Sequence, residues 1–332
     1  MSEVTKAVRV ANRAVRTLLD VQQTDTVLVV TDESGMRENG AIVDAVVGTA
    51  RDIGAETNLI TIEDVPTGVE YVPEMVESAM GMADVLIGIT KTTAASVIHN
   101  EVPEQLEAAG QLRRLYMVKR SFDALTSPNV LEADYEEMLA LGTRIREFVE
   151  DKSRIEITST AGTDVTASIE DAHWKQSSFA HEPGQMTGIS WGEVNSAPVV
   201  GTMEGTAVID GPILEYGWPS PPLELTIREG KVVDVSGDDS IAPRIQRLIE
   251  DNENAENIGE IAFSLNDHAD LRETNIWKKG RGRLHIAIGN GTSYGQNVVS
   301  PVHEDLVMNV PTVVVDGETL IDEGEFVLGE ND

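Results

Sequence analysis

Helix-like and strand-like segments alternate along residues 1–150, and this alternation restricts the folds that they can form. Amphipathic stretches suited to helices occupy residues 4–19, 40–53, 92–109 and 134–149, and short apolar runs suited to strands occupy 26–30, 57–62, 83–89 and 115–118. Strands that alternate with helices form a parallel sheet with helices on both faces. The sequence therefore predicts an α/β protein whose N-terminal domain, residues 1–151, is a doubly wound parallel sheet.

The turn after the first apolar run lacks a nucleotide-binding motif. Residues 32–35 are Asp-Glu-Ser-Gly, which is neither the G-x-G-x-x-G fingerprint nor a P-loop. We therefore expect no nucleotide cofactor in this domain.

Beyond residue 151 the pattern changes to short strands separated by Gly, Pro and Asp. Strand-like segments lie at 154–159, 165–169, 206–209, 223–227 and 231–235, and one helix is expected at 242–249. Residues 228–230 and 315–318 have the composition of hairpin turns. Residues 152–332 are therefore expected to form a second, mainly β (α+β) domain.

The chain is strongly acidic, with 57 Asp and Glu against 25 Lys and Arg and a formal net charge of -32. The acids are spread along the whole chain, and only eight of the basic residues are lysines. Such a surface stays hydrated in concentrated salt, where charges are screened over ~3 Å at 1 M. We predict a halophilic protein, and the same charge argues against nucleic acid or an anionic membrane as a partner.

The N-terminus carries no visible export signal. Residues 1–6, Met-Ser-Glu-Val-Thr-Lys, lack the apolar core of a signal peptide, and no run approaches the ~18 apolar residues that span a membrane. A cytoplasmic location is therefore expected.

Ionisable side chains interrupt three apolar runs in the last third of the chain. Glu260 lies within 258–263, His285 within 284–289, and His303 and Asp305 within 301–308. Burying such groups without a partner costs several kcal/mol, and a shared divalent cation would satisfy all of them. His303 and Asp305 occupy alternate strand positions and can chelate one ion. Because the chain has no cysteine, its metal ligands can only be oxygens and imidazoles.

Five ordered segments resemble the thermophilic-type metalloaminopeptidases, the family that includes aminopeptidase T and aminopeptidase S. These segments are Trp191-Gly192-Glu193-Val194-Asn195-Ser196-Ala197-Pro198, residues 205–211, Gly259-Glu260, residues 284–289 with their His-Ile-Ala-Ile-Gly sequence, and residues 301–305. The resemblance implies a homodimer and two divalent ions, Zn, Co or Mn, in the second domain. The metal ligands that it implies are Glu193, Glu260, His285, Tyr294, His303 and Asp305, with Tyr294 either ligating a metal or donating a hydrogen bond to the oxyanion.

The activity implied by this resemblance is that of a metal-dependent aminopeptidase. Two ions ~3.5–4 Å apart lower the pKa of a bridging water, polarise the scissile carbonyl and stabilise the tetrahedral oxyanion. The expected partner is thus a peptide or another small-molecule substrate.

Two alternatives stay open at the level of sequence. The first is a resemblance to the 2,5-dihydroxypyridine dioxygenases, a related branch that looks like the same scaffold carrying one Fe(II) held by two His and a carboxylate. His303 and Asp305 would be metal ligands in either enzyme. The carboxylates at 193 and 260 favour the dinuclear hydrolase. A third possibility is a metal-binding relative with a non-peptide substrate, because Ile276-Trp277-Lys278-Lys279 replaces an acidic stretch of the aminopeptidases.

The remaining histidines have no spacing that enforces metal binding. His173, His181 and His268 are expected to be structural or solvated, and His99 is given no role.

Overall fold

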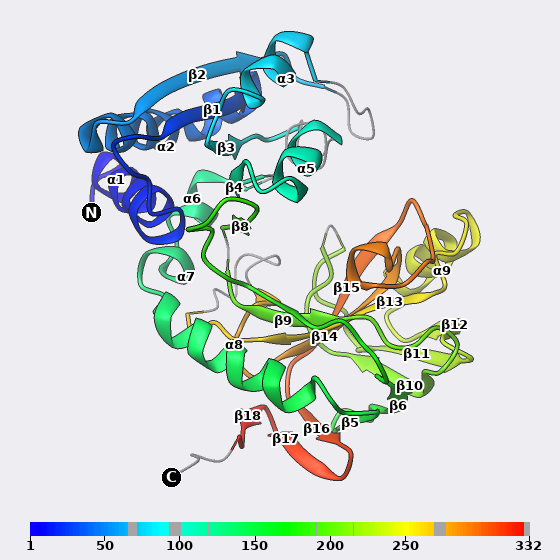
Figure 1. The fold of residues 1–332 in the computed structure, drawn as a ribbon. Helices are drawn as coiled ribbons and strands as arrows, with labels where there is room; N and C mark the ends of the chain where they lie inside the picture. The colour runs from blue at the N-terminus through cyan, green and yellow to red at the C-terminus, as the bar shows by residue number, and fades with distance from the viewer. Residues whose placement is uncertain are drawn as a thin grey trace. The chain divides into compact units, whose positions relative to one another are not determined.

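The computed structural model describes residues 1–65, 72–92, 101–118, 120–189, 191–214, 216–268 and 277–328. The chain forms two compact units: unit 1 is Met1–Ala133 with Ser178–Trp191, and unit 2 is Asp134–Ser177 with Gly192–Asp332. Helices and sheets occur together in the chain (Figure 1), which confirms the α/β class.

The division between the units differs from the single boundary predicted at residues 151–152. Helix α8 (Tyr135–Val149) belongs to unit 2, and residues 178–191 return to unit 1. A side chain added at Gly142 of α8 would lie 3.2 Å from Leu265 and 3.5 Å from Val194, so the helix backbone packs closely on unit 2. Tertiary packing of this kind leaves no local sequence signal.

Unit 1 contains a five-stranded sheet in the order β2-β1-β3-β4-β8, and every neighbouring pair is parallel, as the sequence predicted. The strands are β1 (Thr26–Asp32), β2 (Glu56–Ile62), β3 (Val85–Ile89), β4 (Arg113–Tyr116) and β8 (Met186–Gly188). Its helical segments among the described residues are α1 (Glu3–Asn12), the π-helix η1 (Arg13–Leu18), α2 (Glu33–Ile53), α3 (Glu74–Met80), α5 (Glu101–Ala108), α6 (Phe122–Leu125) and α7 (Pro128–Leu131).

The strands β1 and β3 of this sheet are buried on both faces. Leu28 and Val30 of β1 pack with Val76 and Met80 of α3 on one face. The intervening residues of β1 point to the opposite face and are also buried, and α2 packs against β1 and β2. Burial on both faces explains why β1 and β3 are nearly continuous apolar runs.

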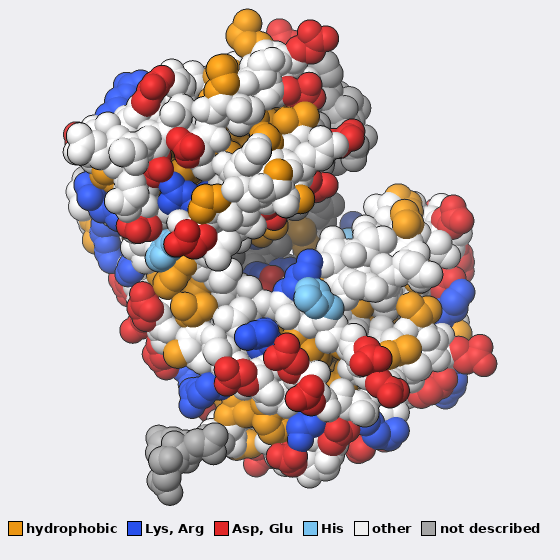
Figure 2. Space-filling model, in the orientation of Figure 1, with side chains coloured by type: hydrophobic (Ala, Val, Ile, Leu, Met, Phe, Trp, Pro, Cys, Tyr) orange, Lys and Arg blue, Asp and Glu red, His pale blue; other side chains and the backbone are white. Residues whose placement is uncertain are grey.

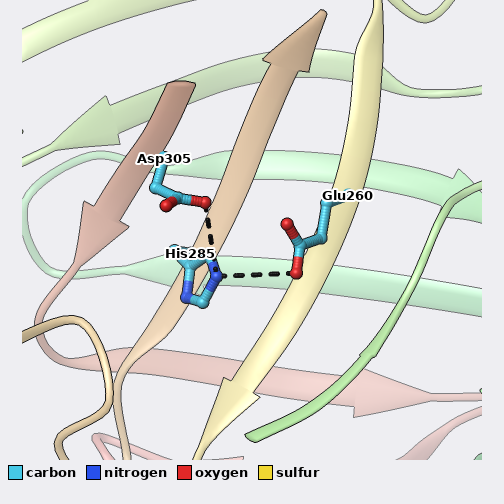
Figure 3. A group of neighbouring side chains, drawn as sticks. All are labelled: Glu260, His285 and Asp305. Carbon is cyan, nitrogen blue, oxygen red and sulfur yellow. Dashed lines mark ion pairs between the residues drawn. The ribbon is translucent and has the colours of Figure 1, made fainter. Parts of the chain in front are cut away.

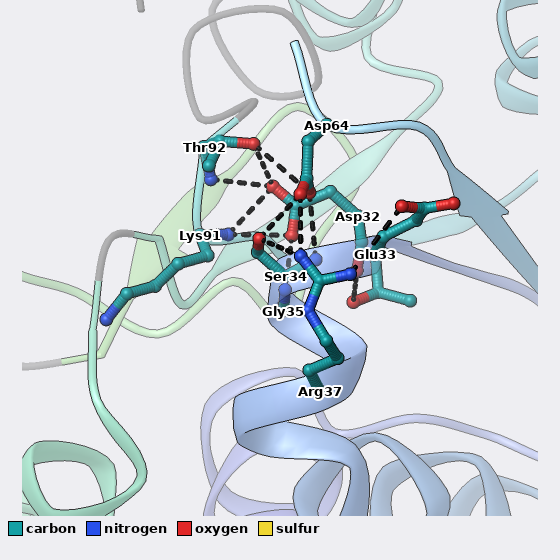
Figure 4. A network of polar contacts seen from close by, with 9 residues as sticks. Asp32, Glu33, Ser34, Gly35, Arg37, Asp64, Lys91 and Thr92 are labelled. Atoms are coloured by element: carbon teal, nitrogen blue, oxygen red, sulfur yellow. Dashed lines mark hydrogen bonds and ion pairs between the residues drawn. The ribbon is translucent and has the colours of Figure 1, made fainter. Parts of the chain in front are cut away.

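Asp32 joins the end of β1 to the start of α2 (Figure 4). Its buried carboxylate accepts hydrogen bonds from the backbone N–H groups of Gly35 at 2.6 Å, Lys91 at 2.9 Å and Thr92 at 2.6 Å. The side chain therefore caps α2 and fixes the chain that follows β3, which is a structural role within unit 1.

Unit 2 is mainly antiparallel. An eight-stranded sheet has the order β12-β11-β10-β6-β5-β16-β17-β18, and a five-stranded sheet has the order β15-β14-β13-β9-β7. The strands of the first sheet are β5 (Arg154–Ser159), β6 (Asp164–Ser168), β10 (Glu204–Ile209), β11 (Leu223–Arg228), β12 (Lys231–Ser236), β16 (Pro311–Val315), β17 (Glu318–Asp322) and β18 (Glu325–Phe326). Those of the second are β7 (Lys175–Gln176), β9 (Glu193–Ser196), β13 (Ile258–Ser264), β14 (Leu284–Gly289) and β15 (His303–Met308), and α9 (Ala242–Glu250) and the 3-10 turn η2 (Thr292–Tyr294) complete the unit.

Both predicted hairpin turns are confirmed. Glu229 and Gly230, between β11 and β12, have φ values of 49° and 70°, and Asp316 and Gly317, between β16 and β17, have 48° and 81°. Two successive residues in the left-handed region form the turn that matches the twist of an antiparallel pair.

The five-stranded sheet has one face against α8. Val194 of β9 lies under that helix, and it pairs with Phe263 of β13, so both residues share the covered face. Alternate residues point the other way, and this opposite face carries the polar residues described below.

The charge distribution follows the composition. Figure 2 shows Asp and Glu side chains scattered over the visible face rather than gathered in one patch. No helix within the described ranges is long and apolar enough to cross a bilayer.

Candidate metal centre

Strand register brings Glu260, His285 and Asp305 to the open face of the five-stranded sheet. Ala287 of β14 pairs with Glu260 of β13 on one side and with Asp305 of β15 on the other. His285 lies two residues before Ala287 and therefore points to the same face. Figure 3 shows the three side chains converging from neighbouring strands.

A β-bulge in β13 turns Glu260 onto this face. Ile258 pairs with Ile288, yet Glu260 pairs with Ala287, so the register shifts by one residue between them. The bulge at Gly259 lets Ile258 and Glu260, two residues apart, point to opposite faces. Bulges of this kind commonly re-aim a side chain at an active site.

The predicted residues Glu193 and His303 lie on the same face. His303 is two residues before Asp305 in β15, and Glu193 pairs with Ser264, which alternates with Glu260 along β13. All five predicted strand ligands thus occupy one surface of one sheet.

The ligand atoms are close enough to share an ion. One donor atom each from Glu260, His285 and Asp305 lie within 4.8 Å of one another. His285 Nε2 is 3.7 Å from Glu260 Oε1 and 3.7 Å from Asp305 Oδ1. His303 Nε2 is 3.0 Å from Glu260 Oε2 and 3.7 Å from Asp305 Oδ1. Asp305 Oδ1 therefore faces both imidazoles.

Several of these atoms are buried without a hydrogen bond. Both ring nitrogens of His285 and the Oδ1 atom of Asp305 have no hydrogen-bond partner, and the His285 ring is fully buried. An unpaired buried polar atom is costly, whereas a cation coordinated by these atoms removes the cost. The donor set fits a divalent metal ion with nitrogen and oxygen ligands.

The backbone orients His303. Its Nδ1 donates a hydrogen bond to the carbonyl oxygen of Asn290 at 3.1 Å, which leaves Nε2 directed at the carboxylates. Burial lowers the pKa of His303, but the hydrogen bond with Glu260 and the charge of Asp305 outweigh burial and raise it to about 9.

Tyr294 lies beside His303. The two rings stack with centroids 5.7 Å apart. Burial and the negative charge of Glu260 raise the pKa of the Tyr294 phenol far above its ordinary value, so it keeps its proton. A neutral phenol here can donate a hydrogen bond into the centre.

Two lysines, which no motif in the sequence assigns to a metal site, complete the centre. Lys278 Nζ lies 2.5 Å from Asp305 Oδ2, and Lys279 is ion-paired with Glu193. The negative charges of Asp305 and Glu193 raise the pKa of Lys278 despite its burial, whereas burial lowers that of Lys279. The available signal was the sequence Ile276-Trp277-Lys278-Lys279, which places two adjacent lysines where the aminopeptidases are acidic.

The lysines keep the carboxylates ionised. Burial raises the pKa of Glu193, but the charges of Lys279 and Lys278 outweigh this effect and lower it. Burial likewise opposes ionisation of Asp305, and Lys278 and His285 lower its pKa overall. The carboxylates therefore offer negative oxygens to a cation.

The other histidines take different positions. His181 belongs to unit 1, where its Nε2 lies 2.9 Å from the carbonyl oxygen of Thr17 and its ring stacks on Phe179. His173 and His268 are not part of the cluster formed by Glu260, His285 and Asp305. His99 lies outside the described residues.

Comparison with known proteins identifies relatives over the full length of the chain. The family model described as 2,5-dihydroxypyridine 5,6-dioxygenase matches residues 8–328. The solved structure of 2,5-dihydroxypyridine dioxygenase from Pseudomonas putida KT2440 is similar with a TM-score of 0.83 and 17% identity, covering 99% of both chains. Wild-type AmpT from Thermus thermophilus is similar with a TM-score of 0.70 and 14% identity, covering 98% of this chain and 100% of that chain. No curated protein sequence matches.

The predicted membership of the metalloaminopeptidases is wrong, and so is the predicted hydrolase activity. The family match spans nearly the whole chain and is to a dioxygenase. The quoted motifs misled because they form the strands of a fold that both kinds of structure share. A fold common to two kinds of enzyme does not reveal which reaction a site performs. The chain belongs to the 2,5-dihydroxypyridine 5,6-dioxygenase family.

Proposed function

We propose that the protein is a dioxygenase that opens a hydroxylated pyridine ring, with one Fe(II) ion held by His285, His303 and Asp305. The observation that carries this proposal is that Asp305 Oδ1 lies 3.7 Å from the Nε2 atoms of both imidazoles. Two His and one carboxylate are the ligands of non-haem iron oxygenases and leave open positions for O2 and substrate. Family membership supports the same activity.

When bound, Fe(II) supplies the redox chemistry by which O2 reacts with an electron-rich ring, which protein side chains do not supply. The surrounding residues keep the ligands in place. Lys278 engages Asp305 Oδ2 at 2.5 Å, so Oδ1 stays directed at the imidazoles. Asn290 holds the Nδ1–H group of His303, so the lone pair of this ring is on Nε2.

Glu260 and Tyr294 provide the remaining polar groups. Asn195 donates a hydrogen bond to Glu260 Oε1 at 3.1 Å, which fixes the carboxylate between the two imidazoles. The protonated phenol of Tyr294 can donate a hydrogen bond to an ionised ring oxygen of the substrate. A hydroxylated pyridine offers such an oxygen, whereas an unsubstituted ring does not.

Oxygen uptake tests the proposal. The protein is freed of metal with a chelator in molar KCl, reloaded with Fe(II) without air, and mixed with 2,5-dihydroxypyridine and O2. We expect equimolar loss of O2 and of the ring absorbance. The reaction should require Fe(II), and Zn(II) should not replace it.

The variant His285→Ala tests the site itself, because it removes one proposed iron ligand from the buried cluster. Lys231→Met, which changes an exposed lysine paired with Glu256, is the control for a lost positive charge. Iron-dependent uptake by wild type and Lys231→Met, but not by His285→Ala, supports the proposal. Equal uptake by all three proteins, or no uptake by iron-loaded wild type, contradicts it.

A further inference from the structure

Lys279 has an unusual environment for a lysine of this chain. It is the only lysine within the described residues that is buried, with 6% of its surface exposed. An ammonium group loses its hydration when it is buried and needs a specific partner to compensate. That partner is the carboxylate of Glu193.

The same oxygen of Glu193 faces both Lys279 and the metal centre. Glu193 Oε2 is the atom paired with Lys279, and it lies 4.0 Å from His285 Nε2. His285 in turn lies between Glu260 and Asp305. Glu193 is therefore near enough to ligate a second metal ion beside the first. The ammonium group of Lys279, however, is paired with Oε2, the carboxylate oxygen that would bind this second ion.

Charge leads to the same conclusion. The face carries three carboxylates, Glu193, Glu260 and Asp305, and two ammonium groups, Lys278 and Lys279. One divalent ion brings this buried set from -1 to +1, whereas two would bring it to +3. An excess of positive charge in a buried site is unfavourable, so the lysines favour a single ion.

We propose that Lys279 takes the place of a second divalent cation at Glu193 and so limits the centre to one metal ion. This inference rests on the proposed mononuclear function and names the residue that makes the centre mononuclear. It predicts that removal of the Lys279 charge converts the centre to one that binds two ions. Lys278 acts differently, because it engages an oxygen of Asp305 other than the one that faces the imidazoles.

The experiment counts metal ions. Full-length wild type, Lys279→Met and the control Lys231→Met are stripped with chelator, saturated with Mn(II) in molar KCl and freed of excess metal. Elemental analysis gives ions per chain, and electron paramagnetic resonance distinguishes an isolated Mn(II) from a spin-coupled pair. We expect one ion in wild type and in Lys231→Met, and two coupled ions in Lys279→Met.

Two further variants test the role of Glu193. Glu193→Gln combined with Lys279→Met should return the count to one, because the carboxylate that would hold the second ion is gone. Lys279→Gln keeps a hydrogen-bond donor for Glu193 without the charge, and should bind two ions even if the Met variant folds poorly.

Two ions in wild type, or one ion in both folded neutral variants at position 279, would overturn the proposal. These outcomes are independent of the dioxygenase assay. If wild type binds one Mn(II) in the metal count but consumes no O2 with 2,5-dihydroxypyridine after loading with Fe(II), the proposed activity is contradicted. The assignment of Lys279 is then still supported.

Discussion

His303 Nε2 lies 3.0 Å from Glu260 Oε2, and its Nδ1 donates to the carbonyl oxygen of Asn290 at 3.1 Å. Without a metal ion, both ring nitrogens can donate only if the imidazole carries two protons. The metal-free centre thus holds a proton on the nitrogen with which His303 would bind a metal ion.

Stability of the metal-free protein should reflect this proton. The pKa of His303 is about 9 in the folded chain and ~6.5 when unfolded, so protonation stabilises the fold fully below pH ~6.5 and the contribution is lost as pH rises through 9. We expect the melting temperature of chelator-treated protein to fall across this range. In His303→Gln the fall in melting temperature should be smaller. Identical pH profiles of wild type and His303→Gln in scanning calorimetry would refute the assignment of this proton to His303.

Metal affinity should depend on the size of residue 287. Ala287 is buried and pairs with both Glu260 and Asp305. A leucine at this position would project between the two carboxylates, so we expect Ala287→Leu to weaken Mn(II) binding by ~100-fold or more, measured by titration calorimetry. Ile286→Leu, on the opposite face of the sheet, is the control. Equal Mn(II) affinities of the two variants would argue against a metal centre formed on the face that carries residue 287.

Tyr294→Phe separates ligation from hydrogen bonding. The variant keeps the ring that stacks on His303 but loses the hydroxyl. If the phenol donates a hydrogen bond to substrate, the metal content stays unchanged while kcat falls by ~100-fold, as for the loss of one donor to a charged oxygen. Loss of metal with the hydroxyl would show instead that Tyr294 is a ligand.

Asp32 should contribute strongly to the stability of unit 1. Asp32→Asn places an amide N–H₂ group among backbone N–H donors and removes charge-assisted hydrogen bonds, so we expect a loss of ~3 kcal/mol in the free energy of unfolding. Asp64 is an exposed carboxylate that pairs with Arg37 and accepts a hydrogen bond from Thr92, which also donates to Asp32, so Asp64→Asn should cost under about 1 kcal/mol. Urea denaturation in molar KCl checks both values.

The dispersed acidic surface predicts salt-dependent stability. Screening of the net charge of -32 relieves repulsion in the folded state, so the melting temperature should rise steeply from dilute buffer to molar KCl. Equal melting temperatures at both salt concentrations would contradict the halophilic interpretation.

The elements of the centre could be predicted because their signals are local. His285 and Asp305 stand out as polar residues within apolar strands, and the alternation of side chains along β14 and β15 brings them to one face. The hairpin at 228–230 could be predicted for the same reason, because turn composition acts over a few residues.

The role of the lysines could not be predicted, since it depends on tertiary packing. Lys278 and Lys279 reach Asp305 and Glu193 from a segment outside the strands that carry these carboxylates. Read without them, the carboxylates suggested two metal ions and hence a hydrolase. The wrong family assignment has a different cause, because the motifs that carried it belong to a fold shared by both kinds of structure.

The extra residue in β13, at Gly259, lets one strand supply an apolar side chain to the hydrophobic interior and a carboxylate to the metal centre. Ile258 belongs to one face and Glu260 to the other, although a regular strand would turn both toward the same side. A methyl group at Gly259 would lie 2.7 Å from the carbonyl oxygen of Asn290, the acceptor for His303. Gly259→Ala would thus disturb a carboxylate and an imidazole together, and deletion of this one residue would reassign every side chain on one half of the strand. Gly259 is therefore a position of β13 at which a single change would affect the hydrophobic interior and the ligand geometry together.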